Sequence, residues 1–209
     1  MNMDDEIVRM FTVYSNVHDM LIDRKYLDVI SGIYVTTKEE FVEKFVKLGT
    51  VDKEAMNFVR MNTTKRSTPS YIYVCFSTEM SIGIKPLAKI TERITASKMT
   101  HCLLVYPGNI TSAAKKYVEK SNKIKIEVFS EEELGVNITK HKLMPLHYVL
   151  TDKERYAWLG ESKISENQLP RILMSDPMAR YYGMRRGDIV RIMRKSDTGG
   201  LYMMYRICN

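Results

Sequence analysis

The sequence predicts an α/β fold, α+β over the whole chain, with a mixed sheet flanked by helices followed by a small α+β module. Helical and strand-like segments alternate over residues 86–129, which is typical of βαβ units and parallel pairing. Of 209 residues, 44% are apolar and 27% charged, the usage of globular domains. Residues 137–209 hold 13 basic and 7 acidic side chains, so they carry +6 of the net charge of +7. This asymmetry predicts two domains, 1–136 and 137–209.

The first domain opens with helical spacing of apolar residues over Asp5–Tyr26. Thr37-x-x-Glu40 predicts a capping box for a second helix, with Gly49 as its C-terminal stop. Polar residues 62–69 predict a hairpin loop between two strands. The elements predicted after this helix are strands over Ala55–Met61 and Ser70–Ser77, a helix over Pro86–Lys98, a strand over His101–Tyr106, a helix over Thr111–Ser121, a strand over Lys123–Phe129 and a helical turn over Glu131–Leu134.

In the second domain, Val136–Leu150 is irregular and is interpreted as a connection between domains. Thr151-x-x-Glu154 predicts a capping box whose helix ends at Gly160. Proline after Asp176 predicts a capped short helix that Gly183 closes. Two strands are predicted around a turn-rich segment at residues 196–200; they are Asp188–Arg194 and Leu201–Ile207.

Catalytic and metal-binding patterns are missing from the sequence. It contains no phosphate-binding loop, no dinucleotide glycine motif and no nucleophile elbow. Glu161-Ser162-Lys163 is the one run that resembles a nuclease motif, and it follows a helix stop. The acidic run Glu131–Glu133 is interpreted as a solvated helix start. We therefore expect no enzyme activity, no cofactor, no metal and no small-molecule substrate.

The cysteines and histidines fit structural roles. The three cysteines are too scattered for a disulfide framework or a zinc site and are expected to be buried hydrophobes in a reducing compartment; they are Cys75, Cys102 and Cys208. His18 and His101 lie in apolar patterns and are interpreted as core residues. The longest apolar runs fall far short of the ~20 residues that cross a bilayer. A soluble intracellular protein without a membrane partner is expected.

The strongest local feature is Asp176–Arg194, which carries five arginines against two aspartates. Arginine presents a planar fork to carboxylates or phosphates and stacks on aromatic rings. The segment is therefore interpreted either as a docking surface for another protein or as a phosphate-contacting patch. In the predicted strand, Arg191 and Arg194 point to opposite faces, so they do not serve one patch.

This stretch resembles the family signature of the fifth subunit shared by the eukaryotic nuclear RNA polymerases, and it is also similar to the corresponding small subunit of archaeal RNA polymerase. Weaker matches upstream extend the resemblance over the whole chain; among them are the interdomain segment from Asn137 and the run Gly83-Ile84-Lys85. The residues that carry it are Leu169-Pro170-Arg171-Ile172, Asp176-Pro177, Ala179-Arg180-Tyr181, Gly183, Arg186-Gly187, Val190, Arg194, Ser196-Asp197-Thr198, Gly200, Tyr202 and Tyr205-Arg206.

The resemblance implies a non-catalytic subunit of a nuclear DNA-directed RNA polymerase. Its first domain is then a jaw beside downstream double-stranded DNA, and its second is an assembly domain that docks on the largest polymerase subunit, with other subunits as further partners. The residues implied in assembly are Asp176, Pro177, Arg180, Tyr181, Gly183, Arg186 and Gly187. A free-standing nucleic-acid-binding transcription regulator is the alternative.

The resemblance also implies that a loop of the jaw approaches DNA, and here the sequence departs from the family. The family's Thr-Pro-Ser-Ala follows a glycine, whereas Ile110 and Thr111 stand before the matching Ser112 and Ala113. A helix N-terminus at this point still offers N–H groups to a phosphate. The residues expected near DNA are Ser112, Ala113, Lys115 and Lys116. In the last hairpin, Asp197-Thr198-Gly199 replaces the family's Glu-Thr-Ala.

Overall fold

A computed structural model describes residues 3–28, 35–62, 70–97, 99–121, 124–196 and 200–209. The chain divides into two compact units, Met1–Val136 and Asn137–Asn209, called here the N-terminal and C-terminal domains. The predicted loop at 62–69 lies, apart from Asn62, outside the described residues, and so does Asp197-Thr198-Gly199. Each domain is described by itself.

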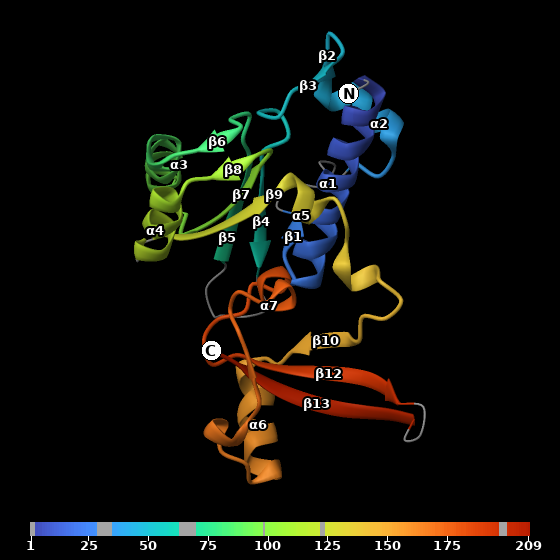
Figure 1. Cartoon of the computed structure of the whole chain (residues 1–209), viewed down its shortest axis with the longest axis vertical. Coiled ribbons are helices and arrows are strands. Elements are labelled where there is room, and N and C mark those ends of the chain that lie inside the picture. The colour runs from blue at the N-terminus through green and yellow to red at the C-terminus, as the bar shows by residue number, and fades with distance from the viewer. Residues whose placement is uncertain (1–2, 29–34, 63–69, 98, 122–123, 197–199) are drawn as a thin grey trace. The chain divides into compact units, whose positions relative to one another are not determined.

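The N-terminal domain is built on a five-stranded mixed sheet with strand order β1-β4-β5-β7-β9 (Figure 1). The first three strands are antiparallel neighbours, whereas β5, β7 and β9 run parallel. Their bounds are β1 Leu27–Asp28, β4 Phe58–Asn62, β5 Ser70–Phe76, β7 His101–Tyr106 and β9 Lys125–Ser130. The parallel half confirms the predicted βαβ alternation, and the mixed sheet confirms the predicted fold class.

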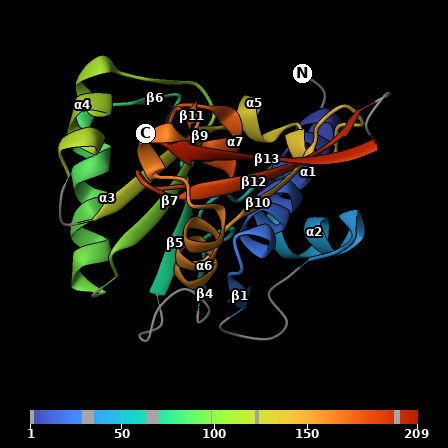
Figure 2. The same cartoon turned by 90° about the horizontal axis from the view of Figure 1, so that it is seen from below.

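Helices cover both faces of this sheet (Figures 1 and 2). On one face, α3 and α4 pack Leu87 and Ala114 against Cys75 and Leu104. On the other, α1 places the Tyr14 ring against Phe58 and Phe76 of the sheet, and α2 lies beside α1. The bounds of the helices are α1 Met3–Asp23, α2 Lys38–Phe45, α3 Ile84–Ala96, α4 Ser112–Lys120 and α5 Glu131–Leu134.

The second helix ends earlier than predicted. Thr37 is its N-cap, but Glu40 accepts from the backbone N–H of Thr36 instead of closing a capping box on Thr37. The helix stops at Phe45, where β2 (Val46–Lys47) begins a hairpin with β3 (Thr50–Val51). Gly49 is therefore a turn residue with φ 80° and not a helix stop. Helix α3 begins at Ile84, two residues before the predicted start at Pro86.

The acidic run is not fully solvated, so that interpretation was wrong for its first member. Ser130 and Glu133 form a capping box around α5. Glu131 is only 1% exposed, and its carboxylate lies 2.5 Å from Lys53 Nζ and 3.2 Å from Arg9 Nη2. Glu132 and Glu133 lie at the surface. The first glutamate of the run therefore belongs to a buried charge cluster, whereas the other two carboxylates are exposed.

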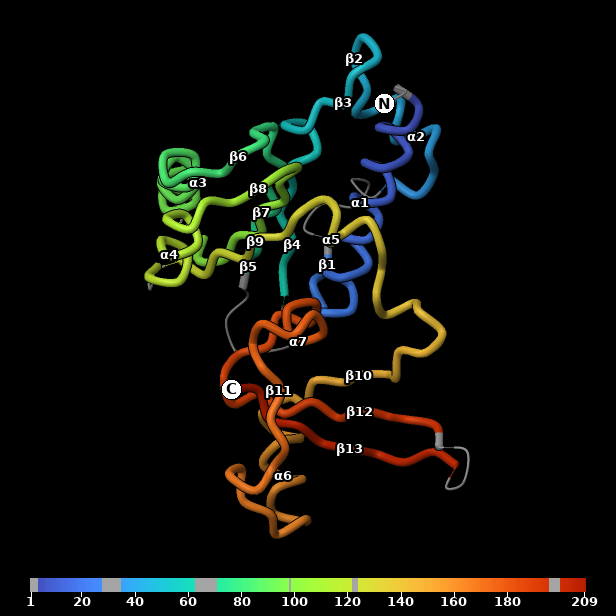
Figure 3. Tube along the Cα trace, viewed as in Figure 1, coloured from blue at the N-terminus to red at the C-terminus, as the bar shows by residue number. Residues whose placement is uncertain are grey.

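The C-terminal domain contains a four-stranded sheet with order β10-β12-β13-β11, in which only the β11–β13 pair is parallel (Figure 3). The segment predicted as irregular contains β10, which pairs with β12, and the helix at 151 continues through Gly160. The elements are η1 Ile138–Lys140, β10 Leu146–Val149, α6 Asp152–Ser162, η2 Glu166–Gln168, β11 Arg171–Ile172, α7 Pro177–Tyr181, β12 Ile189–Ser196 and β13 Gly200–Cys208.

The three cysteines are free thiols inside the two domains. Cys75, Cys102 and Cys208 are buried, as the sequence predicted. Burial raises the pKa of the Cys75 thiol to about 11 and raises the pKa of Cys102 as well, so both stay protonated and unreactive at neutral pH. No described helix has both the length and the apolar character to span a membrane.

Candidate functional site

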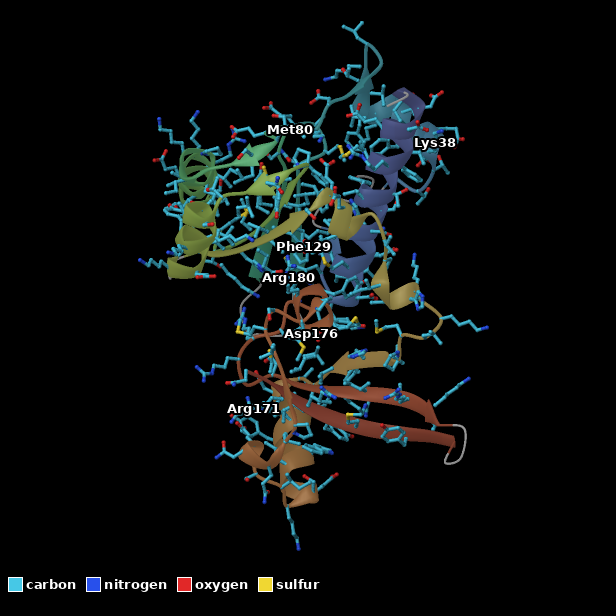
Figure 4. All side chains as sticks on the ribbon, viewed as in Figure 1. Lys38, Met80, Phe129, Arg171, Asp176 and Arg180 are labelled. Atoms are coloured by element: carbon cyan, nitrogen blue, oxygen red, sulfur yellow. The ribbon has the colours of Figure 1, made fainter. Side chains whose placement is uncertain are left out.

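The short helix α7 begins as the sequence predicted. The carboxylate of Asp176 accepts from the backbone N–H of Met178 at 2.8 Å, and Pro177 occupies the first helical position. Figure 4 labels Asp176 and Arg180, which belong to the two ends of this helix. The helix is followed by Gly183 at φ 60°, a left-handed conformation that glycine adopts without steric cost. The cap and the glycine fix where the following turn starts.

The turn after α7, residues 184–188, is held by the last residues of β13. Gly187, at φ 90°, donates to the carbonyl of Cys208, whose own N–H donates to Asp188. On the other side, Asn209 donates to Ile172 and Met174 donates to Asn209. Residues 208–209 are thus bracketed by two backbone segments. Because these bonds are all main-chain, each of the two segments is held rigidly against residues 208–209.

These two segments and the end of α7 contribute a set of basic and apolar residues, which we call the arginine turn: Leu173, Met174, Arg180, Arg185 and Arg186. Arg185 and Arg186 are exposed, and Arg180 is half-buried. Leu173 and Met174 are 63% and 49% exposed. Arginine and methionine are enriched in protein interfaces.

The structure brings most of the predicted assembly residues together, with distinct roles. Asp176, Pro177, Gly183 and Gly187 shape the backbone. Tyr181 is 6% exposed, so its ring packs within the domain and presents little surface to a partner. Sequence reasoning missed Leu173 and Met174, because their exposure depends on pairing with residue 209, and no local pattern marks it.

A second group of polar and aromatic side chains lies on the β12–β13 ribbon. Arg191 stacks its guanidinium 5.0 Å from the Tyr148 ring, which lies directly across the strand pair. Tyr205 stacks on Trp158 of α6 with ring centroids 4.0 Å apart. Arg191 and Arg194 are three residues apart in one strand and lie on opposite faces. Arg191 is therefore engaged within the domain and is separate from the arginine turn.

The residues expected near DNA cluster at the start of α4. Thr111, which stands in the family's proline position, is the N-cap and accepts from the N–H of Ala114 at 3.2 Å. Ser112 and Ala113, in the first turn, and Lys115 and Lys116, in the next, are all exposed. The replacement of proline thus preserves a capped helix start with two ammonium groups beside it.

A close backbone contact positions this helix start. Gly108 packs on Met80, labelled in Figure 4, so tightly that a Cβ would collide with the Met80 carbonyl oxygen. Asn109 donates to that same carbonyl at 2.9 Å, and Thr111 donates to Ile82. The short parallel pair β6 (Ser81–Ile82) and β8 (Asn109–Ile110) continues this link. The start of α4 is therefore anchored to β6.

Polar groups in the N-terminal domain form a largely buried network. Tyr26 donates to or accepts from His101 at 3.1 Å, and His101 contacts Glu127 at 2.8 Å. The guanidinium of Arg24 and the ammonium of Lys125 lie 2.8 Å from Glu127. Despite burial, these cations and His101 hold the pKa of Glu127 well below its usual range. Tyr26 is 9% exposed, so this is a structural network.

The described residues contain no group of three or more His, Cys, Asp or Glu side chains that could hold a metal ion. His18 and His101 are buried, as predicted. His147 is also buried, and its Nδ1 lies 2.7 Å from the Pro145 carbonyl. The two surface features described above are the arginine turn and the start of α4.

The fold and these surfaces define a two-domain α+β protein that displays a rigid arginine turn. Residues 4–94 match the family described as RNA polymerase Rpb5, N-terminal domain, and residues 136–208 match RNA polymerase Rpb5, C-terminal domain. The chain therefore belongs to the RNA polymerase Rpb5 family, which confirms the resemblance seen in its sequence.

Relatives align over nearly the full length of both chains. The chain is 40% identical to DNA-directed RNA polymerase subunit 5-like protein 1 of Arabidopsis thaliana, with 98% of each chain covered. It is 35% identical to a Dictyostelium discoideum protein, DNA-directed RNA polymerases I, II, and III subunit rpabc1, over 98% of this chain and 99% of that one. It is 34% identical to the Caenorhabditis briggsae subunit RPABC1, with 98% of each covered.

Proposed function

We propose that this chain is a non-catalytic, nuclear subunit of a DNA-directed RNA polymerase. Family membership and full-length similarity to proteins named as subunits of polymerases I, II and III support the proposal. The largest polymerase subunit is the partner of the C-terminal domain, and downstream double-stranded DNA lies beside the N-terminal domain within the complex.

The observation that carries the docking proposal is the arginine turn. Exposed Arg185 and Arg186 follow α7, and exposed Leu173 and Met174 belong to the segment that residues 208–209 hold by main-chain hydrogen bonds on their other side. A rigid surface loses little conformational entropy on binding, and arginine forks pair with carboxylates in two-pronged geometry. The partner surface is therefore apolar with acidic residues at its rim.

Reversing two charges of this surface is expected to weaken assembly. Arg180→Glu with Arg186→Glu places two carboxylates against the acidic rim, so recovery of the variant with purified polymerase should fall about tenfold or more. The measurement is quantitative mass spectrometry of polymerase purified from cells that express the tagged variant.

The control is Lys142→Glu with Lys153→Glu, which changes the net charge of the same domain equally at exposed positions away from α7. It should leave recovery unchanged, and both variants should keep the thermal unfolding midpoint of the unmodified chain within a few degrees. Normal recovery of the arginine variant in folded form contradicts the docking proposal.

The DNA-facing role is proposed for the start of α4. Ser112 and Ala113 offer their helix-terminal N–H groups to a phosphate, and Lys115 and Lys116 add positive charge. The N-terminal domain as a whole carries a net charge of about +1, because its 19 basic and 18 acidic residues nearly balance. Contact with DNA therefore depends on placement by the polymerase and not on attraction of the free chain.

Two measurements test this role. The free chain is expected to bind duplex DNA no more tightly than about 10⁻⁴ M at physiological salt. In assembled polymerase, Lys115→Glu with Lys116→Glu should reduce cross-linking of downstream DNA to a photoreactive residue at position 112. Lys89→Glu with Lys120→Glu, also exposed on α3 and α4, is the control. Tight, salt-resistant binding by the free chain supports a free-standing regulator instead.

A further inference from the structure

The β2–β3 hairpin of the N-terminal domain carries a leucine at its tip in an unfavourable conformation. Leu48 has φ 50° and the following Gly49 has φ 80°, so both central residues of the two-residue turn are left-handed. Such turns favour Asn-Gly or Gly-Gly, since a branched side chain with positive φ crowds its own backbone. Leu48 therefore occupies a position where local conformation favours another residue.

The same side chain is as exposed as a side chain can be, with a relative accessibility of 105%. Among the residues of the domain that the structure describes, none compensates for the strain by burying this side chain. Figures 1 and 3 show the hairpin projecting from the body of the N-terminal domain. Strained residues persist where the surrounding structure holds them, and they concentrate at functional positions.

The hairpin presents this leucine rigidly. Val46 pairs with Val51, and Thr50 donates its hydroxyl to the Lys47 carbonyl at 3.0 Å. At the base, Asp52 donates its N–H to the carbonyl of Phe45, which is buried. β3 packs against α1. The tip is therefore held in place before any partner arrives, which lowers the entropy lost on binding.

The charges around the tip indicate what kind of partner fits. Residues 43–54 contain three lysines and three acidic residues, so this segment has no net charge. Lys47 lies 2.8 Å from Asp52, and this pair neutralises the charge nearest the tip. Binding to nucleic acid depends on unpaired cations against phosphates. A neutral hairpin with an apolar tip matches a protein pocket instead.

We propose that the β2–β3 hairpin is a docking element whose Leu48 side chain inserts into an apolar pocket on another protein. The partner is a folded protein that has an apolar pocket the size of one leucine side chain. Binding requires no charged group on that partner. This inference does not depend on the proposed function, because it concerns a surface apart from the arginine turn and from α4.

The experiment places a photoreactive amino acid at position 48 of the full chain in its native cells and identifies adducts by mass spectrometry. The expected result is an adduct with one protein other than this chain, at a peptide that lines an apolar pocket. Leu48→Asn should then reduce co-purification of that protein about tenfold or more, whereas Leu48→Met should retain it. No adduct, or an adduct with nucleic acid or with a second copy of this chain, overturns the proposal.

The thermal unfolding midpoint distinguishes a loss of binding from a loss of folding in this experiment. Asparagine tolerates left-handed φ, so Leu48→Asn should raise the thermal unfolding midpoint or leave it unchanged. Loss of partner in a variant at least as stable as the original supports docking, and a lowered midpoint contradicts it. Leu143, an exposed leucine of the C-terminal domain, is the matched control. Leu143→Asn should leave co-purification of the adduct protein unchanged, and an equal loss overturns the proposal.

Discussion

Replacing Glu131 by alanine is expected to lower the free energy of unfolding of the N-terminal domain by about 3–5 kcal/mol. Its carboxylate is 1% exposed and lies 2.5 Å from the ammonium of Lys53, whose side chain is itself only 10% exposed. Arg9 approaches the same carboxylate at 3.2 Å. Without Glu131, the Lys53 charge stays buried with its principal counter-charge gone, and desolvation of that charge is then uncompensated.

Urea unfolding followed by far-ultraviolet circular dichroism measures the effect. Glu132→Ala is the matched control, since Glu132 is the neighbouring carboxylate in the same short helix but is exposed. It should change the unfolding free energy by no more than about 0.5 kcal/mol. Replacing both partners, Glu131→Leu with Lys53→Met, should recover most of the loss because the buried Lys53 ammonium is removed together with its counter-charge. Equal losses in the Glu131 and Glu132 variants contradict the buried pair.

Glu131 also shows where sequence reasoning reaches its limit. Three consecutive glutamates indicate the start of a helix, and α5 does start there. Which of the three is buried depends on Lys53, which lies 78 residues away in the sequence. A periodic pattern reports the local face of a helix and says nothing about a counter-charge from a distant loop. The helix was predictable, and the buried pair was not.

The helix boundaries that the sequence predicted correctly depend on local chemistry, and the boundary that it predicted wrongly depends on tertiary pairing. Thr151 with Glu154 and Asp176 with Pro177 were recognisable because capping is local chemistry, and the structure has both. Gly49 was misread because Phe45 and Leu48 continue a helical spacing, whereas pairing of Val46 with Val51 ends the helix. Tertiary pairing overrides spacing wherever an apolar run is short.

For the candidate docking surface, the sequence predicted the residues that shape the backbone. It predicted only some of the exposed residues that a partner could contact. The φ of 60° at Gly183 follows from glycine after a helix. The segment that contains exposed Leu173 and Met174 is positioned by the pairing of residue 209 with residues 172 and 174. That pairing joins segments more than thirty residues apart, so no local rule contains it.

Lowering the pH from 7 to 5 is expected to reduce the unfolding free energy by about 2 kcal/mol through His18 alone. The imidazole is fully buried between Tyr14 and Phe58, with ring centroids 4.3 Å from each. Burial first, and then the positive charges of Arg60 and Lys44, lower the pKa of His18 from 6.5 to about 3. Its charged form is thus strongly disfavoured in the folded domain.

The direction of the pH effect follows from where the proton binds. Below pH 6.5 the unfolded chain takes up a proton at His18, whereas the folded chain does so only near pH 3. The unfolded state binds more protons throughout this pH range. The stability that the neutral His18 imidazole contributes is therefore fully present above pH 6.5 and falls as the pH decreases toward 3. Burial also lowers the pKa values of His101 and His147, so both add to the fall in the same direction.

Unfolding curves at pH 7, 6 and 5 for the unmodified chain and for His18→Gln isolate this contribution. Glutamine offers an acceptor oxygen near Arg60 but does not titrate. Between pH 7 and pH 5, the free energy of unfolding of the variant should therefore fall by about 2 kcal/mol less than that of the unmodified chain, whatever the stability of the variant at pH 7. If His18→Gln shows the same pH slope as the unmodified chain, then His18 titrates alike in both states, and the buried neutral imidazole is refuted.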